Sequence, residues 1–246
     1  MEVEDKLALP GSDQVEKRKV ASLRALVEAE NPDAKEVDNM TLRRFLRARD
    51  LDVEKASAQF LKHLKWRKTI MPNGFISESE ISNELAHKEL YKQGFDKQGR
   101  PIIVYLVANH VSAGRQMDEL KRFAVYALEK ACVSMPNGQE KFIIISDLQG
   151  WGYSSCDVRG YLSAIDILQS YYPERLGKAF LINVPYIFMK VWNVIYQFLD
   201  AKTKEKFIFV GKKELRDTLL EDIDESQLPE KYGGRLSLVP IEESIE

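Results

Sequence analysis

The strongest constraint on this chain is a run of fifteen residues, Pro185 to Leu199, of which twelve are apolar. Pro185 suits the first turn of a helix, and at about 100° per residue the polar members, Lys190, Asn193 and Gln197, fall on one narrow strip. Most of the helix surface must therefore be covered by apolar material. The run is shorter than the roughly 20 residues that span a bilayer. It is either an ordinary core helix or a helix that closes over an apolar ligand.

The composition is that of a globular protein, with 246 residues, 44% of them hydrophobic and 30% charged. Such a chain is long enough for one large domain, or for a large domain with a small one. The formal net charge of -2 gives no overall attraction to nucleic acid, so no nucleic-acid partner is expected. Two cysteines, Cys132 and Cys156, argue against a disulfide framework. The first residues lack the basic region and apolar core of a secretion signal, which predicts a cytoplasmic protein.

Helical periodicity dominates the first part of the chain. Apolar spacing predicts a helix over residues 14–30, a second that begins near residue 39 or 41, and a third that starts at residue 52 or 53 and ends near residue 70. Three helices therefore precede any strand. A weaker helical stretch covers residues 77–90.

Arg49 stands apart from the other arginines of the second helix, because it lies seven residues after Leu42 and so returns to within about 20° of the apolar face. An unpaired charge in a dry site costs several kcal/mol, so a buried Arg49 needs an anionic partner. The alternative is a frayed helix end, from which Arg49 turns back to solvent. Arg43, Arg44 and Arg47 are expected on the solvated face.

Short apolar runs in the rest of the chain predict buried strands at residues 102–107, 142–148, 179–184 and 207–210. The helical stretches between them cover residues 117–135, 158–172 and 185–199. Strands that alternate with helices need crossover connections. The sheet is therefore expected to be largely parallel and the fold to be α/β.

Motifs of catalysis are missing from the sequence. It has no phosphate-binding loop, no dinucleotide fingerprint and no nucleophile elbow, and its three histidines lack metal-ligand spacing. No catalytic residue and no metal ligand is therefore assigned. Asp147, at the end of a predicted strand, is the one candidate for an α/β enzyme, but a helix cap or a loop tie is the favoured interpretation.

Seven motifs follow one another between residues 15 and 238. They are TLRRFLRARDLDVEKA with a later WRK, DKQGRP, DL.G, YYPERLGK, IN.P, FLD..T..K and LPE.YGG. In order and spacing this series closely resembles the CRAL-TRIO lipid-binding family, and within it the secretory phosphatidylinositol transfer proteins. Such a chain of spaced motifs is far more specific than any one of them.

The resemblance implies an N-terminal helical lobe over residues 14–72 and a CRAL-TRIO lobe over residues 77–238, whose mostly parallel sheet floors an apolar lipid pocket. Residues 1–13 and 239–246 are expected to be flexible termini. The resemblance also implies that the protein binds a single phospholipid, with phosphatidylinositol the first candidate, and exchanges it between membranes without chemistry. The bound lipid is then the expected ligand, no cofactor is expected, and the protein acts as a monomer that visits membrane surfaces transiently.

The resemblance assigns roles to particular residues. The apolar helix takes the place of the family's gate, and its gate residues are Ile187, Phe188, Val191, Trp192 and Ile195. The family's phosphate-contacting arginine falls on Arg49, and its other headgroup positions fall on Glu174, Thr203 and Lys206. A lipid phosphate would supply the anion that a buried Arg49 needs.

Two pocket positions depart from family members that also bind choline lipids. Those members place small hydroxyl residues on the second strand, where this chain has Phe142 and Ile144. A choline phospholipid is therefore not expected as a second ligand, whereas a ligand of the sterol, tocopherol or retinoid type stays open. The functional alternative is a lipid-dependent sensor that presents its lipid to a phosphoinositide kinase or docks on a small GTPase.

Overall fold

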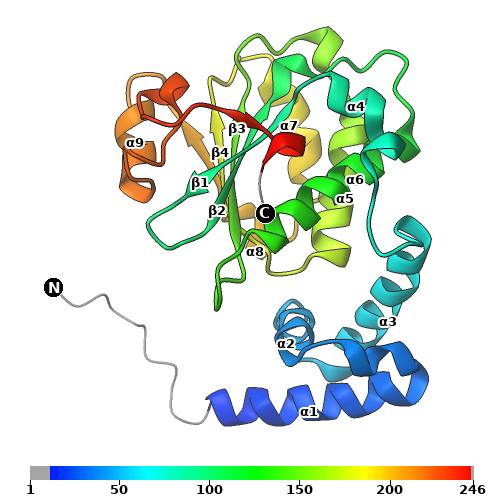
Figure 1. Ribbon diagram of the computed structural model, residues 1–246. Coiled ribbons are helices and arrows are strands. Elements are labelled where there is room, and N and C mark those ends of the chain that lie inside the picture. The colour runs from blue at the N-terminus through cyan, green and yellow to red at the C-terminus, as the bar shows by residue number, and fades with distance from the viewer. Residues whose placement is uncertain (1–11, 245–246) are drawn as a thin grey trace, which may run out of the picture. The chain divides into compact units, whose positions relative to one another are not determined.

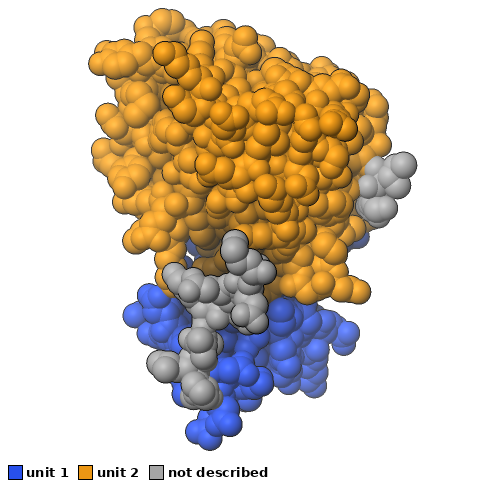
Figure 2. Space-filling view, turned by 90° about the vertical axis from the view of Figure 1, so that its left-hand side faces the viewer, with its two compact units in different colours: residues 1–74 blue, residues 75–246 orange. Residues whose placement is uncertain are grey.

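The structure is a computed structural model that describes residues 12–244, and the chain divides into two compact units, residues 1–74 and 75–246 (Figure 2). Most of the N-terminal segment predicted to be flexible, residues 1–13, lies outside the described residues, and the first helix already begins at Ser12. Residues 245–246 of the C-terminal segment also lie outside them. Each unit has a hydrophobic core of its own.

Unit 1 is built from helices α1 (Ser12–Glu30), α2 (Asn39–Arg47) and α3 (Val53–Ile70), with a 3-10 turn at Pro32–Glu36 (Figure 1). Aspartate side chains cap the N-termini of α2 and α3. Asp38 accepts from the Thr41 N–H over 2.7 Å and Asp52 from the Lys55 N–H over 3.0 Å. Each such cap typically stabilises a helix by about 1 kcal/mol. The apolar faces of the three helices then close one core.

The expectation of a solvated face is correct for Arg47, which is exposed, but wrong for Arg44, which is buried, and Arg43 is half-buried. Arg43 and Arg47 reach Glu16 of α1, with nitrogen to carboxylate oxygen distances of 3.0 Å and 2.5 Å. Arg44 is buried, and its guanidinium donates to the Thr41 hydroxyl over 2.6 Å. The pattern of α2 alone cannot predict these contacts, because an ion pair between helices depends on how the helices pack.

Unit 2 contains a six-stranded, mostly parallel sheet. Its strands are β1 (Leu90–Phe95), β2 (Pro101–Leu106), β3 (Phe142–Asp147), β4 (Leu176–Ile182), β5 (Phe207–Val210) and β6 (Val239–Pro240). The order across the sheet is β5-β4-β3-β2-β1-β6. Strands β2 to β5 run parallel to one another, and β1 is antiparallel to both β2 and β6. The predicted α/β class with an N-terminal helical region is confirmed.

Helices and the loops between them cover both faces of this sheet. Alternate residues of a strand point to opposite sides, and Ile102 and Ile143 are fully buried on the side that packs against α9 (Leu215–Asp222). The other side faces α5 (Met117–Val133), α6 (Val158–Tyr171) and α7 (Phe188–Tyr196) (Figure 1). A short helix, α8 (Ala201–Lys204), precedes β5. Burial on both faces explains the continuous apolar runs in the strand sequences.

The sequence patterns do not predict β1 and β6. Before β1 they predict one helix over residues 77–90, where the structure has a 3-10 turn (Glu78–Ile81) and α4 (Ser82–Ala86). The sequence predicts that residues 239–246 are a flexible terminus. This prediction is wrong for residues 239–244, which include strand β6. This part pairs with β1 at the sheet edge, buries Ile241 and places Glu242 against Lys88.

Helix α7 is shorter than the predicted run from residue 185 to residue 199. The residues just before and just after α7 form tighter turns, in which each hydrogen bond joins residues three apart and not four. The Phe188 N–H donates to the Pro185 carbonyl over 2.9 Å, and the Phe198 N–H donates to the Ile195 carbonyl over 3.0 Å. Such 3-10 turns are common at helix ends. Within residues 12–244, no helix has both the length and the apolar composition needed to cross a bilayer.

Candidate binding pocket

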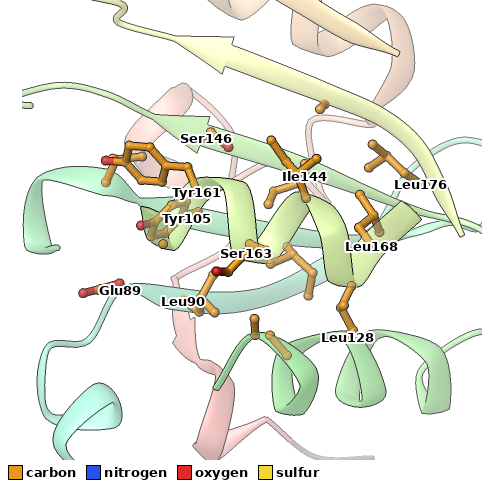
Figure 3. A pocket seen from close by; sticks show the side chains of 18 of the residues that line it. Glu89, Leu90, Tyr105, Leu128, Ile144, Ser146, Tyr161, Ser163, Leu168 and Leu176 are labelled. Atoms are coloured by element: carbon orange, nitrogen blue, oxygen red, sulfur yellow. The ribbon is translucent and has the colours of Figure 1, made fainter. Parts of the chain in front are cut away.

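A cavity of about 270 Å³ lies in unit 2 between the sheet and the helices α5, α6 and α7 (Figure 3). Its floor comes from every second residue of the central strands, because these side chains share one face of the sheet. On β3 these residues are Phe142, Ile144 and Ser146, so both positions predicted to line the pocket do line this cavity. The lining is almost entirely apolar, which suits the hydrocarbon part of a ligand.

The floor is arranged in rows that run across the sheet. Ile144 of β3 pairs with Ile103 of β2 and with Ala179 of β4, which makes one apolar row. The next row lies closer to the carboxyl ends of the strands and contains Tyr105 and Ser146. Side chains paired in this way are direct neighbours, with Cβ atoms about 5 Å apart.

Helix α7 covers the cavity with part of its surface. Phe188, Trp192 and Ile195 are buried and line the cavity, at spacings of four and three residues that place them on one face. Trp151 supports this face, because its ring meets that of Phe188 edge-on with centroids 5.2 Å apart. Val191 is half-buried against the same cluster.

The outward surface of the α7 region is also apolar. Tyr186 is 90% exposed and Phe198 is 58% exposed, and Ile187, Val194 and Tyr196 are exposed as well. The five predicted gate residues therefore divide into two groups. Ile187 faces outward, whereas the other four pack toward the cavity. The apolar circumference seen in the sequence thus has an inner face over a cavity and an outer face on the surface of unit 2.

Two predicted headgroup residues lie where parallel strands begin. Glu174 comes shortly before β4, in a left-handed backbone conformation with φ of 61°, which is uncommon for a residue other than glycine. Lys206 directly precedes β5, and Lys141, directly before β3, lies 3.9 Å from Glu174. Burial lowers the pKa of the Lys206 ammonium, and the Glu174 carboxylate opposes that shift. The amino end of this sheet thus gathers two cations and one carboxylate.

Thr203, the third predicted headgroup residue of unit 2, is buried and already engaged. Its backbone N–H donates to Asp200 Oδ1 over 2.7 Å, and its hydroxyl donates to Asp200 Oδ2 over 2.9 Å. Asp200 is the N-cap of α8, so this contact fixes the turn before β5. The Thr203 oxygen keeps a lone pair with which it can accept a hydrogen bond.

Arg49 does not lie on a buried helix face, so that prediction is wrong. Helix α2 ends at Arg47, and the N–H of Arg49 donates to the Leu46 carbonyl over 3.1 Å in the turn that follows. The Arg49 side chain is exposed. The sequence placed Arg49 on the apolar face by assuming that the helix continues through residue 49. The alternative of a frayed helix end describes the structure. Arg49 belongs to unit 1 and the other headgroup residues belong to unit 2, and their use of one ligand stays a prediction.

Asp147, at the carboxyl end of β3, is held by other side chains. It accepts hydrogen bonds from Asn183 over 2.9 Å and from the Tyr232 hydroxyl over 3.1 Å, and Lys231 Nζ lies at 2.7 Å. Burial works to raise the pKa of Asp147, but its hydrogen bonds from Lys231, Asn183 and the Gln149 N–H outweigh burial and lower that pKa. This carboxylate ties the chain at residues 231–232 to the sheet, as the loop-tie interpretation expects.

The sequence patterns did not identify the polar residues of the cavity, among them three hydroxyl-bearing side chains at one end. Tyr105 of β2, Ser146 of β3 and Tyr161 of α6 lie near one another at one end of the cavity (Figure 3). A signal for the first two existed, since they follow Ile103 and Ile144 by two residues and must share their side of each strand. Their pairing across the strands depends on the register of β2 and β3, which the sequence does not show.

Sequence comparison places both units in known families. Residues 85–234 match the family described as CRAL/TRIO domain, and residues 12–62 match the family described as CRAL/TRIO, N-terminal domain. Sec14 cytosolic factor of Schizosaccharomyces pombe is 34% identical over 215 residues, which cover 80% of this chain and 75% of that protein. Phosphatidylinositol transfer protein CSR1 of Eremothecium gossypii is 31% identical over 209 residues, which cover 80% of this chain but 47% of that protein.

A solved structure, that of Sfh5, has the same fold. It matches with a TM-score of 0.70 and 18% sequence identity, over 100% of this chain and 93% of that one. Among the relatives found by sequence, this chain spans three quarters or more of the length of some and less than half of the length of others.

Proposed function

The chain belongs to the CRAL/TRIO family, and from this premise we propose that it binds a single phospholipid, with phosphatidylinositol the first candidate, and exchanges it between membranes. Lipid transfer is the family-level function of its Sec14-like relatives, one of which bears the name of a phosphatidylinositol transfer protein. The observation that carries the proposal is an apolar cavity under a helix whose outer surface is apolar too.

The hydrophobic effect explains why such exchange needs a membrane. Each methylene group buried from water contributes about 0.8 kcal/mol, so two acyl chains hold a lipid tightly and release into water is extremely slow. When the cavity opens at a bilayer, the acyl chains can pass directly from the cavity into the hydrocarbon core of the bilayer. The exposed residues around α7, among them Tyr186 and Phe198, supply apolar surface that can enter the bilayer interface.

The polar residues at the amino end of the sheet suit an inositol phospholipid. Lys206 and Lys141 provide positive charge for a phosphate, and Glu174 can accept hydrogen bonds from inositol hydroxyls. Thr203 offers an oxygen as a further acceptor. Arg49 would add a guanidinium from unit 1. In this proposal the protein acts in the cytoplasm without covalent chemistry, and no residue has a catalytic role.

A vesicle transfer assay tests the headgroup preference. Donor vesicles that carry labelled phosphatidylinositol or labelled phosphatidylcholine are mixed with unlabelled acceptors, and the protein-dependent transfer rate is measured for each. Because Phe142 and Ile144 leave the floor without hydroxyls at those positions, we expect transfer of phosphatidylinositol and little or no transfer of phosphatidylcholine. Equal rates for the two lipids would contradict the proposed preference.

A further inference from the structure

Two stretches of the chain have the same sequence, Met-Pro-Asn-Gly, at residues 71–74 and 135–138. They contain the only two asparagines of the sequence that precede a glycine. Such a pair is chemically reactive, because the glycine nitrogen can attack the side-chain amide carbon of the asparagine, and no Cβ on the glycine hinders the approach. Since the local sequences are identical, a difference in reactivity between the two pairs must come from the fold.

Both pairs lie in exposed turns. Asn73 and Gly74 follow α3, and Asn137 and Gly138 lie between α5 and β3. The glycines have φ angles of 83° and 86°, in the left-handed region that favours glycine. At either glycine the position of a Cβ has no described atom within 4 Å, apart from the adjoining residues. Solvent water and space for a rearranged backbone are thus present at both pairs.

The two glycine nitrogens differ in their hydrogen bonds. The Gly74 N–H donates to the Met71 carbonyl over 3.0 Å. In the second turn the closing hydrogen bond comes from the next residue, because the Gln139 N–H donates to the Pro136 carbonyl over 2.9 Å. Among residues 12–244, none accepts a hydrogen bond from the Gly138 N–H. The attacking nitrogen is therefore held in the first pair and available in the second.

We propose that Asn137 is a site of spontaneous deamidation. The Gly138 nitrogen forms a bond to Cγ of Asn137 and gives up its proton. The bond from Cγ to the side-chain nitrogen breaks, and this nitrogen takes up the proton and leaves as ammonia, so that a cyclic succinimide remains. Water then adds to one of the two ring carbonyls and opens the ring. The product is aspartate, or isoaspartate when the main chain passes through the former side chain.

The reaction changes the charge and the backbone of the connection that leads into β3. The product carries one more negative charge than asparagine, four residues before Lys141, and the isoaspartate form lengthens the main chain by one methylene group. Lys141 is one of the cations at the amino end of the sheet. The inference goes beyond the proposed function and does not depend on it, because the reaction needs water and no lipid.

Peptide mapping measures both sites in one sample. The purified full chain is incubated at neutral pH for increasing times and is then digested with trypsin. The enzyme cuts after Lys68 and Lys88 around the first pair, and after Lys130 and Lys141 around the second, so each pair lies in its own peptide. Mass spectrometry with fragmentation counts the converted fraction at each asparagine. Methylation by an isoaspartyl methyltransferase identifies the isoaspartate form.

The expected result is a faster conversion of Asn137 than of Asn73. Because the Gly74 nitrogen must first release the Met71 carbonyl, we expect Asn137 to convert about fivefold faster, the factor that corresponds to one hydrogen bond of about 1 kcal/mol.

Two controls separate the fold from the sequence. In guanidinium chloride the hydrogen bond between Gly74 and Met71 is lost, and the two asparagines should then convert at about the same rate. Asn137→Gln has a longer side chain that would close a larger ring much more slowly. This variant should lose the signal at residue 137 and keep the conversion of Asn73, and circular dichroism checks that it folds.

Each outcome decides the inference. Faster conversion of Asn137 in the folded protein, with similar rates at the two sites in the unfolded chain, supports it. Equal rates in the folded protein, a faster conversion of Asn73, or no conversion of Asn137 would overturn it. The same ratio in the folded and unfolded chains would also overturn it, because the fold would then not set the difference. Lipid transfer is measured separately in the vesicle assay, so the proposed function stands or fails independently.

Discussion

Lys206 carries its charge in a half-buried position directly before β5, where Glu174 is the carboxylate that favours this charge most. A lipid phosphate would replace part of the hydration that burial removes. We therefore expect Lys206→Ala to slow phosphatidylinositol transfer at least roughly tenfold, since a hydrogen bond to a charged group contributes about 1.5–3 kcal/mol. The control is Lys212→Ala, which removes an exposed lysine. Equal transfer by both variants would assign Lys206 a structural role only.

The lowered pKa of Lys206 predicts an alkaline limit of transfer. Because burial lowers this pKa below the ordinary 10.5, the ammonium loses its proton at a lower pH than an exposed lysine does. The charged form binds phosphate, so transfer should be full below the lowered pKa and should fall as the pH rises through it. Lys206→Arg keeps its charge and should move the fall to higher pH. A decline at the same pH in both proteins would show that another group titrates.

The resemblance, and not a local pattern, gave Phe142 and Ile144 as pocket positions. Both line the cavity, and strand alternation explains why they point to the same side of the sheet. Arg49 fails because its placement assumed that α2 continues past Arg47. The ion pairs of Glu16 with α2 were also beyond prediction, since they arise between segments that are distant in the sequence.

Helix α7 is the element on which exchange depends in this account. Its inner residues close the cavity, and the chain around it exposes apolar side chains, with Phe198 58% and Ile187 37% accessible. If this surface enters the bilayer, an added charge there costs several kcal/mol. We expect Ile187→Asp and Phe198→Asp to abolish sedimentation with vesicles, and quenching of Trp192 by brominated acyl chains to be lost with it.

A matched substitution controls for the added charge. Val133→Asp places an acid at another exposed apolar residue, at the end of α5, and should leave vesicle binding intact. Phe188→Asp is not a clean test, because Phe188 is buried against Trp151 and the variant would damage the core. Full transfer without any quenching of Trp192 would mean that α7 stays in place and that the lipid leaves by another route.

Elements were predictable where one pattern repeats over enough residues. The four apolar strands and the long helices follow from period and burial, and their α/β order follows from their alternation. Strand β1 has a mixed, half-buried pattern, and β6 contains two residues, so neither carries a periodic signal. The shortened α7 reflects 3-10 turns at both ends, which composition does not distinguish from α-helix.

On the scale of the whole molecule, the chain consists of two compact units with separate cores, and the cavity belongs entirely to the second. The order of the motifs predicts this family and its fold. The antiparallel pairing of β1 with β6 joins positions about 150 residues apart, and only the folded chain reveals it.

The most direct test of lipid binding is the lipid content of the protein itself. The full chain is purified from a cell that makes phosphatidylinositol and is extracted with organic solvent, and its lipids are identified and counted by mass spectrometry. We expect about one lipid molecule per chain, with phosphatidylinositol as the most abundant phospholipid. A cavity that yields no lipid in stoichiometric amount, from protein shown to be folded, would contradict it.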